Sequence, residues 1–242
     1  MDDLTLDSIC GVRLYQRAGG YRFSVDSVLL AGFARLSRSA KMVADLGAGS
    51  GVVGLVLAAR CPWVRVLLVE IQEGLSSLAE RNIVLNRLQD RVAVLRADVS
   101  SVASGGERNL LEGFDAVVSN PPFRKPGTGR VSPCGERAVA RHEIRLSLKD
   151  LLRTSSALLK TRGRFYMIHH PSRFSEAVCT MRDFHLEPKR VRFVHPDGSS
   201  EATMVLIEAV KGGGTELKVE RPLFVYEEDG SYTGEAASFF AP

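Results

Sequence analysis

The sequence predicts an α/β fold: a Rossmann-like, mostly parallel sheet of seven strands with helices on both faces. Two observations support this prediction. Apolar runs of strand length alternate with helical patterns from about residue 41 to residue 210, as in chains whose parallel strands are joined by helices. A glycine-rich turn and several polar side chains also fall where strands are expected to end, and that edge is where open α/β sheets bind ligands.

The individual elements follow from length and periodicity. Seven runs have the composition of buried strands: 42–46, 64–69, 92–95, 114–118, 164–168, 190–194 and 203–209. Four patterns between them predict helices: 52–60, 73–86, 146–159 and 171–184. In the second helix one face recurs at helical spacing, with Glu80 and Arg81 on the other face; it consists of Leu75, Leu78, Ala79, Asn82 and Ile83.

Two segments lie outside this alternation. Residues 1–40 form an N-terminal extension, in which a turn at 19–24 leads into an apolar helix that is expected to cover one side of the sheet. Residues 41–210 form the main domain. Residues 211–242 form a tail that begins with a three-glycine linker, and its alternating apolar residues predict one short extra strand.

Composition narrows the class of protein. With 242 residues and 45% apolar content, the chain is long enough to bury a full core in one domain. It has no apolar run of about 18 residues and starts with Met1, Asp2 and Asp3, so we expect a soluble cytoplasmic protein without membrane attachment. Its four cysteines form no C-x-x-C pair, and we expect neither a metal site nor disulfides; they are Cys10, Cys61, Cys134 and Cys179.

Positive charge is concentrated in one part of the chain. The net charge is +4, yet residues 121–173 contain twelve Lys or Arg residues against three acidic ones. Such a bias fits a polyanionic partner whose phosphates are bound near this segment. A solvated basic face without a partner is the alternative.

The turn after the first strand of the main domain indicates a nucleotide-like ligand. Gly47, Gly49 and Gly51 allow a ligand to approach the backbone closely. The pyrophosphate-binding fingerprint requires glycine where this chain has Val52. Asp45 would repel a dinucleotide but attract the ammonium group of S-adenosylmethionine, which is therefore the predicted cofactor. Alternatively, Asp45 caps the following helix.

Two more acids stand at the ends of the next two strands. Glu70 closes the second strand, where an acid can accept both ribose hydroxyls of a cofactor. Asp98 follows the third strand and is placed to accept the adenine amino group. Either acid alone is equally consistent with a solvated strand end, but three acids at consecutive strand ends favour a binding edge.

The fourth strand ends in Asn120, Pro121, Pro122 and Phe123. The prolines make this turn stiff and remove two N–H donors, so that it is rich in acceptors. The Asn120 side-chain oxygen and the Pro121 carbonyl can together accept the two N–H bonds of a planar amine, on which Phe123 would stack. An ordinary loop is the alternative.

With these motifs the chain resembles the class I S-adenosylmethionine-dependent methyltransferases that act on amino groups, and among them the bacterial tRNA (valine) adenine-N6 methyltransferase family. The resemblance is strongest at residues 20–30, 120–123, 138–143 and 188–196. It implies catalysis by Asn120, Pro121, Pro122 and Phe123, and cofactor binding by Asp45, Gly47, Gly49, Gly51, Glu70, Asp98 and Asn120. That family often carries Tyr where this chain has Phe123, which keeps the stacking surface.

The resemblance also implies a substrate. N6-methylation of an adenine in an RNA, most of all in a tRNA anticodon loop, is the predicted reaction, with tRNA or another structured RNA as partner and no obligate protein partner. The basic residues expected to hold its phosphates are Arg124, Lys125, Arg130, Arg137 and Arg141. The alternatives are N5-methylation of a protein glutamine, N6-methylation of adenine in DNA and, outside the methyltransferases, an NAD-dependent oxidoreductase.

Overall fold

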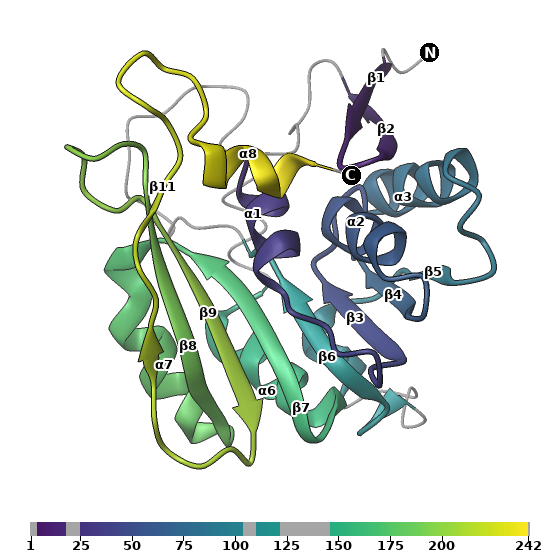
Figure 1. Cartoon of the computed structure of the whole chain (residues 1–242). Coiled ribbons are helices and arrows are strands. Elements are labelled where there is room, and N and C mark those ends of the chain that lie inside the picture. The colour runs from purple at the N-terminus through teal and green to yellow at the C-terminus, as the bar shows by residue number, and fades with distance from the viewer. Residues whose placement is uncertain (1–3, 18–24, 104–109, 122–145, 242) are drawn as a thin grey trace, which may run out of the picture.

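The computed structural model describes residues 4–17, 25–103, 110–121 and 146–241. A central sheet dominates it (Figure 1). Its main strands lie in the spatial order β5 (Val92–Leu95), β4 (Arg65–Val69), β3 (Met42–Leu46), β6 (Phe114–Ser119), β7 (Leu159–His169), β9 (Met204–Lys211) and β8 (Leu186–His195). The strands from β5 to β7 are parallel, whereas β9 is antiparallel to both of its neighbours.

The seven predicted strands are confirmed, and the fold is the predicted mostly parallel α/β sheet. Two strands begin earlier than predicted. In β7 the polar residues 160–163, which include a glycine, concealed the start of the strand. In β8 the start was concealed by Pro188, which nevertheless pairs with Ala209 of β9 next to a break in register.

Helices cover both faces of the sheet. One face packs against α1 (Val25–Phe33), α2 (Val52–Arg60) and α3 (Glu73–Leu85). The other packs against α4 (Val99–Val102), α6 (Leu148–Leu158) and α7 (Phe174–Asp183), the last preceded by the short turn η2 (Pro171–Arg173). Alternate residues of each strand serve the two cores, as Val43 and Ala44 do in β3. Among the described helices, none is long and apolar enough to cross a bilayer.

A hairpin of β1 (Leu4–Ile9) and β2 (Val12–Arg17) was not predicted. Its turn has Cys10 and Gly11 at φ 50° and 76°, the pair of positive angles typical of a two-residue hairpin. The hairpin docks on α3, where Asn82 and Asn86, one helical turn apart, exchange hydrogen bonds with the β2 backbone. The asparagines thus occupy the hydrogen-bonding edge of β2.

The tail contains more than the one strand predicted. The strands β10 (Lys218–Val219) and β11 (Leu223–Phe224) both run parallel to β8, and α8 (Gly234–Phe240) then lies across α1 (Figure 1). A Cβ at Gly32 of α1 would lie 2.3 Å from the Phe239 ring, so a glycine there permits this close approach. Domain boundaries at residues 40 and 210 stay a prediction.

A buried ionic cluster joins three strands to α1. Glu208 of β9 accepts from Arg190 of β8 at 2.7 Å and also pairs with Arg164 of β7. The Arg190 guanidinium donates to the Phe33 carbonyl at 2.7 Å and stacks over the Phe33 ring at 3.7 Å. The Tyr166 hydroxyl donates to the Arg35 carbonyl at 3.0 Å. The carboxyl end of α1 is therefore held by the strands that pack beneath it.

This cluster predicts that two substitutions lower the free energy of unfolding by unequal amounts. Glu208→Ala leaves the buried Arg190 charge without its main partner, and we expect the free energy of unfolding to fall by about 3–5 kcal/mol in urea titrations. Arg182→Ala removes an exposed pair with Glu187 and should cost less than about 1 kcal/mol. Equal costs would contradict the structural importance of the buried cluster.

Candidate functional site

The polar strand ends converge at one edge of the sheet. Strands β5, β4, β3 and β6 are neighbours and parallel, so their carboxyl ends share this edge. Asp45 of β3 is in register with Leu68 of β4 and Val118 of β6. Glu70 and Asn120 each follow two residues after those partners. The structure therefore brings the residues predicted from separate motifs to one edge of the sheet.

The glycines of the turn after β3 differ in their surroundings. Gly47, Gly49 and Gly51 have φ angles of 73°, 58° and 89°, a region unfavourable for other residues. A Cβ on Gly47 or Gly49 would meet nothing within 4 Å, whereas one on Gly51 would lie 2.9 Å from Leu68. Gly47 and Gly49 thus border open space fit for a ligand, and Gly51 allows α2 to pack closely on β4.

Asp45 is buried beneath the first turn of α2. Its Oδ2 accepts the Gly54 amide at 2.9 Å, so the structure shows the helix-capping contact that the sequence left as an alternative. The Asp45 pKa is raised to about 7, chiefly by burial; the hydrogen bond from Gly54 opposes this rise, and the neighbouring Glu70 charge adds to it. The contact of Asp45 with a cofactor ammonium stays a prediction.

Glu70 and Asp98 also make local contacts. The Glu70 carboxylate is buried and accepts the amides of Gly49 at 2.9 Å and Gln72 at 2.8 Å. Asp98 caps α4 by accepting the amide and hydroxyl of Ser100 at 2.9 and 2.8 Å. Because a carboxylate has about four acceptor sites, both side chains keep capacity for a ligand. Acids around an open glycine turn fit a cationic, ribose-bearing cofactor, and the ribose and adenine contacts stay predictions.

Hydrogen bonds from Asn120 and from its neighbour Ser119 fix the end of β6. The Asn120 Nδ2 donates to Ser27 Oγ of α1 at 3.1 Å, while the preceding Ser119 donates its hydroxyl to the Leu46 carbonyl of β3 at 2.7 Å. Pro121 is buried. The other predicted catalytic and substrate-binding residues lie outside the described residues: Pro122, Phe123, Arg124, Lys125, Arg130, Arg137 and Arg141.

Sequence reasoning missed the residues that hold the site in place. Fully buried Asn82 of α3 donates to the Ser50 carbonyl of the glycine turn at 3.1 Å as well as to the hairpin. One sign of this role was available, because Asn82 continues the apolar face of Leu75, Leu78 and Ala79 with a polar side chain. Ser27 lies within residues 20–30, where the resemblance is strongest, but no role was assigned to it there.

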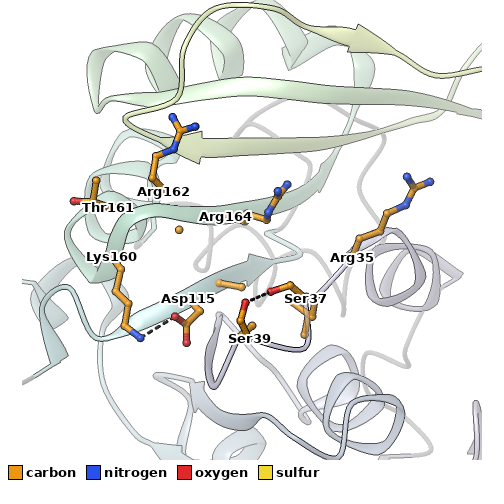
Figure 2. A pocket seen from close by; sticks show the side chains of 12 residues that line it. Arg35, Ser37, Ser39, Asp115, Lys160, Thr161, Arg162 and Arg164 are labelled. Carbon is orange, nitrogen blue, oxygen red and sulfur yellow. Dashed lines mark hydrogen bonds and ion pairs between the residues drawn. The ribbon is translucent and has the colours of Figure 1, made fainter.

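A pocket of about 160 Å³ lies away from this edge. It is formed where β6 and β7 begin, at the opposite ends of the strands (Figure 2). Lys160 in it pairs with Asp115 at 2.7 Å, and Arg164 pairs with Glu208. Since open α/β sheets bind ligands at the carboxyl ends of their strands, and these charges are already paired, the pocket is not the site.

The described residues also contain no group of three or more metal-ligating side chains. His169, at the end of β7, is buried, which together with the Arg173 charge lowers its pKa to about 4. Its Nδ1 accepts the His170 amide at 2.8 Å. His169 is therefore neutral at physiological pH.

Comparison with known proteins places this geometry among methyltransferases. The family model of the methyltransferase small domain matches residues 25–181. A protein from Aeromonas hydrophila named tRNA1(Val) (adenine(37)-N6)-methyltransferase is 27% identical, covering 91% of this chain and 89% of its own. A protein of the same name from Porphyromonas gingivalis is 31% identical, covering 77% and 73%.

Solved structures share the fold. A predicted O-methyltransferase from Agrobacterium tumefaciens is 25% identical with a TM-score of 0.70, covering 88% of this chain and 94% of its own. The TYW2 protein of P. horikoshii, solved in complex with MeSAdo, is 15% identical with a TM-score of 0.61, covering 88% and 73%. The second of these likenesses concerns the fold alone.

The glycine turn provides a test of cofactor binding at the carboxyl ends of β3, β4 and β5, the cofactor edge. In Gly49→Ala the added methyl enters the open space that a ligand would fill, and the affinity for S-adenosylmethionine measured by calorimetry should fall at least about tenfold. Gly212→Ala is the control, because it has a similar φ of 63° and open surroundings away from the site. Both variants should lose about 1–2 kcal/mol of stability, and equal cofactor affinities would contradict the assignment.

The raised pKa of Asp45 predicts a pH-dependent stability of the cofactor-free protein. Its pKa is about 7 in the folded state against 3.8 ordinarily, so the unfolded state releases its proton first as pH rises. The Asp45 contribution to the free energy of unfolding therefore falls between pH 4 and 7, by at most about 4 kcal/mol. Urea titrations should show this fall in the difference between the parent and Asp45→Asn, and a difference independent of pH would refute it.

Proposed function

Since the chain belongs to the methyltransferase small domain family, we propose that it transfers the methyl group of S-adenosylmethionine to the N6 amine of an adenine in tRNA. Relatives that align with most of the chain support the substrate, because they carry the name tRNA1(Val) (adenine(37)-N6)-methyltransferase. An anticodon-loop adenine is accordingly the proposed target. A cytoplasmic location, where the tRNA is met, is part of the proposal.

The position of Asn120 is the observation that carries this proposal. Its side chain stands at the carboxyl end of β6, beside the glycine turn after β3, and its Nδ2 is engaged by Ser27. The oxygen end of the amide is then available to an N–H donor. An exocyclic amine carries two such donors, and the carbonyl of Pro121, the next residue, is the proposed second acceptor.

The proposed mechanism relies on these acceptors. The N6 amine of adenine is a poor nucleophile because its lone pair is delocalised into the ring. When Asn120 Oδ1 and the Pro121 carbonyl accept its N–H bonds, the nitrogen moves toward tetrahedral geometry and its lone pair becomes available. S-adenosylmethionine supplies the methyl group, and the electron pair of the broken C–S bond stays on its sulfur.

The same acceptors stabilise the transition state more than the ground state. The nitrogen becomes positive as its bond to the methyl carbon forms, so both N–H···O bonds strengthen. It then loses one proton to solvent and returns to a neutral amine. The chemistry requires neither a strong base nor a metal ion from this chain.

Substrate binding is proposed from the sequence. Phe123 stacks on the adenine, which must leave its own stack to enter the site. An anticodon loop presents such bases at low cost. Arg124, Lys125, Arg130, Arg137 and Arg141 contact the neighbouring phosphates.

One experiment tests the reaction and the substrate together. The protein is incubated with S-adenosylmethionine labelled in its methyl group and with tRNA, DNA or protein extract, and the modified residue is identified by mass spectrometry. We expect label in N6-methyladenine of tRNA. Label confined to DNA or to a protein glutamine would overturn the substrate, and the absence of transfer to any amine would overturn the reaction.

Asn120→Ala tests the role of the acceptor. Removing an acceptor that acts mainly on the transition state should lower kcat by about 100-fold. The dissociation constant for S-adenosylmethionine should rise far less than kcat falls, because Asn120 is only one of the predicted cofactor contacts and the glycine turn and its acids are unchanged. Turnover equal to that of the parent would rule out the proposed clamp.

A further inference from the structure

The contact between α1 and Asn120 points to a residue to which neither the motifs nor the resemblance assigned a role. Asn120 Nδ2 lies 3.1 Å from the Oγ of Ser27, which is 93 residues earlier in the chain. Ser27 is 7% exposed and stands in the first turn of α1, among the apolar residues that pack on the sheet. A polar side chain in such surroundings requires a hydrogen-bond partner.

The chemistry of the amide makes this contact directional. An asparagine amide has an accepting end and a donating end, and only Oδ1 can accept from an amine. When Oδ1 faces the amine, Nδ2 must face the opposite side and needs an acceptor there. Ser27 Oγ lies at that position. If no acceptor were present, the partly buried N–H group would favour rotation of the amide, which would turn a donor toward the donor of the substrate.

The distance between the two residues is maintained by the fold. Arg190 and Tyr166, from β8 and β7, hold the carboxyl end of α1 through the Phe33 and Arg35 carbonyls. Ser119 holds the end of β6 against β3. Neither partner can therefore shift easily to compensate for loss of the contact.

We infer that Ser27 is a positioning residue that keeps the Asn120 amide oxygen directed at the substrate amine. This inference rests on the proposed amino-group methylation, since Ser27 acts through Asn120 and makes no bond to the reacting atoms. It sets the orientation of the acceptor and leaves the binding of the cofactor and of the RNA to other residues.

The kinetic test compares Ser27→Ala, Ser27→Thr and the parent. Losing one partly buried hydrogen bond that orients the acceptor should lower kcat about tenfold. The dissociation constant for S-adenosylmethionine and the KM for RNA should stay within about twofold, and Ser27→Thr, which keeps a hydroxyl, should recover most of kcat. An unchanged kcat in Ser27→Ala would overturn the inference.

A matched control separates orientation from general loss of packing. Ser155 is a buried serine of α6 on the other face of the sheet, and its hydroxyl donates to the Leu151 carbonyl at 2.7 Å. Ser155→Ala should leave kcat unchanged. A tenfold loss in this control would show that any buried serine has the same effect and would overturn the inference.

A double-mutant cycle with Asn120→Ala gives the sharpest result. If Ser27 acts only through the Asn120 amide, Ser27→Ala should cause no further loss of kcat in the Asn120→Ala background. A structural role independent of Asn120 would lower kcat by the same factor in both backgrounds, and that outcome would refute the positioning role.

The inference can fail separately from the proposed function. Should the parent methylate a glutamine amide instead of adenine, the substrate assignment fails while the kcat ratio for Ser27→Ala still decides the role of Ser27. Should it transfer no methyl group, NMR of the Asn120 side-chain NH2 decides. Its exchange with solvent should accelerate about tenfold in Ser27→Ala, because the Nδ2–H···Oγ bond is lost, and unchanged exchange would overturn the inference.

Discussion

The hydrogen bond from the Gly54 amide to the buried Asp45 carboxylate is the interaction on which the cofactor edge depends. It joins the end of β3 to the first turn of α2, so the chain between them must turn within a few residues, and its glycines adopt positive φ angles to do so. Glu70 and Asn82 then hold two further points of the turn, the Gly49 amide and the Ser50 carbonyl. Burial of the carboxylate carries a desolvation cost, which the raised pKa of Asp45 reflects.

The position of Asn120, where the substrate amine is proposed to bind, depends on the helix α1. Asn120 follows β6, but its side chain is bonded to α1, which comes before the whole sheet in the sequence. The Arg190–Glu208 cluster holds that helix at its other end, and α8 packs across it at Gly32. Helices α1 and α8, from the two ends of the chain, therefore support Asn120, the proposed acceptor. This explains why a buried ionic cluster far from the cofactor edge matters to the geometry of the site.

The sequence predicted the elements whose residue pattern is local, namely the strands and helices of the sheet. Buried parallel strands are short apolar runs, and the helices between them have apolar residues at helical spacing. Three elements were therefore predicted with the observed limits: the strands 42–46 and 92–95 and the helix 52–60. The acids were located correctly at strand ends, yet their partners were not foreseen, because the Gly54 and Gly49 amides depend on the path of the turn in space. Ser27 was missed because its partner is 93 residues away. The hairpin was missed because β1 is only partly buried, with Leu6 53% exposed.

The charges of the site imply how its two ligands must be arranged. Asp45, Glu70 and Asp98 lie at the carboxyl ends of three adjacent strands, and negative charge there favours a cation while opposing phosphate groups. Because the pKa of Asp45 is raised to about 7, this residue contributes only part of a charge at neutral pH. The basic residues proposed to bind phosphate follow the Asn120 turn in sequence: Arg124, Lys125, Arg130, Arg137 and Arg141. Lys160, Arg162 and Arg164 of the same basic segment lie instead at the opposite ends of the strands. In the proposed complex the acids repel the RNA backbone and the basic residues after the Asn120 turn attract it, so the substrate places only an uncharged group beside the acids. A base turned out of its stack satisfies that requirement, because it brings its amine to Asn120 while its phosphates stay among the cations.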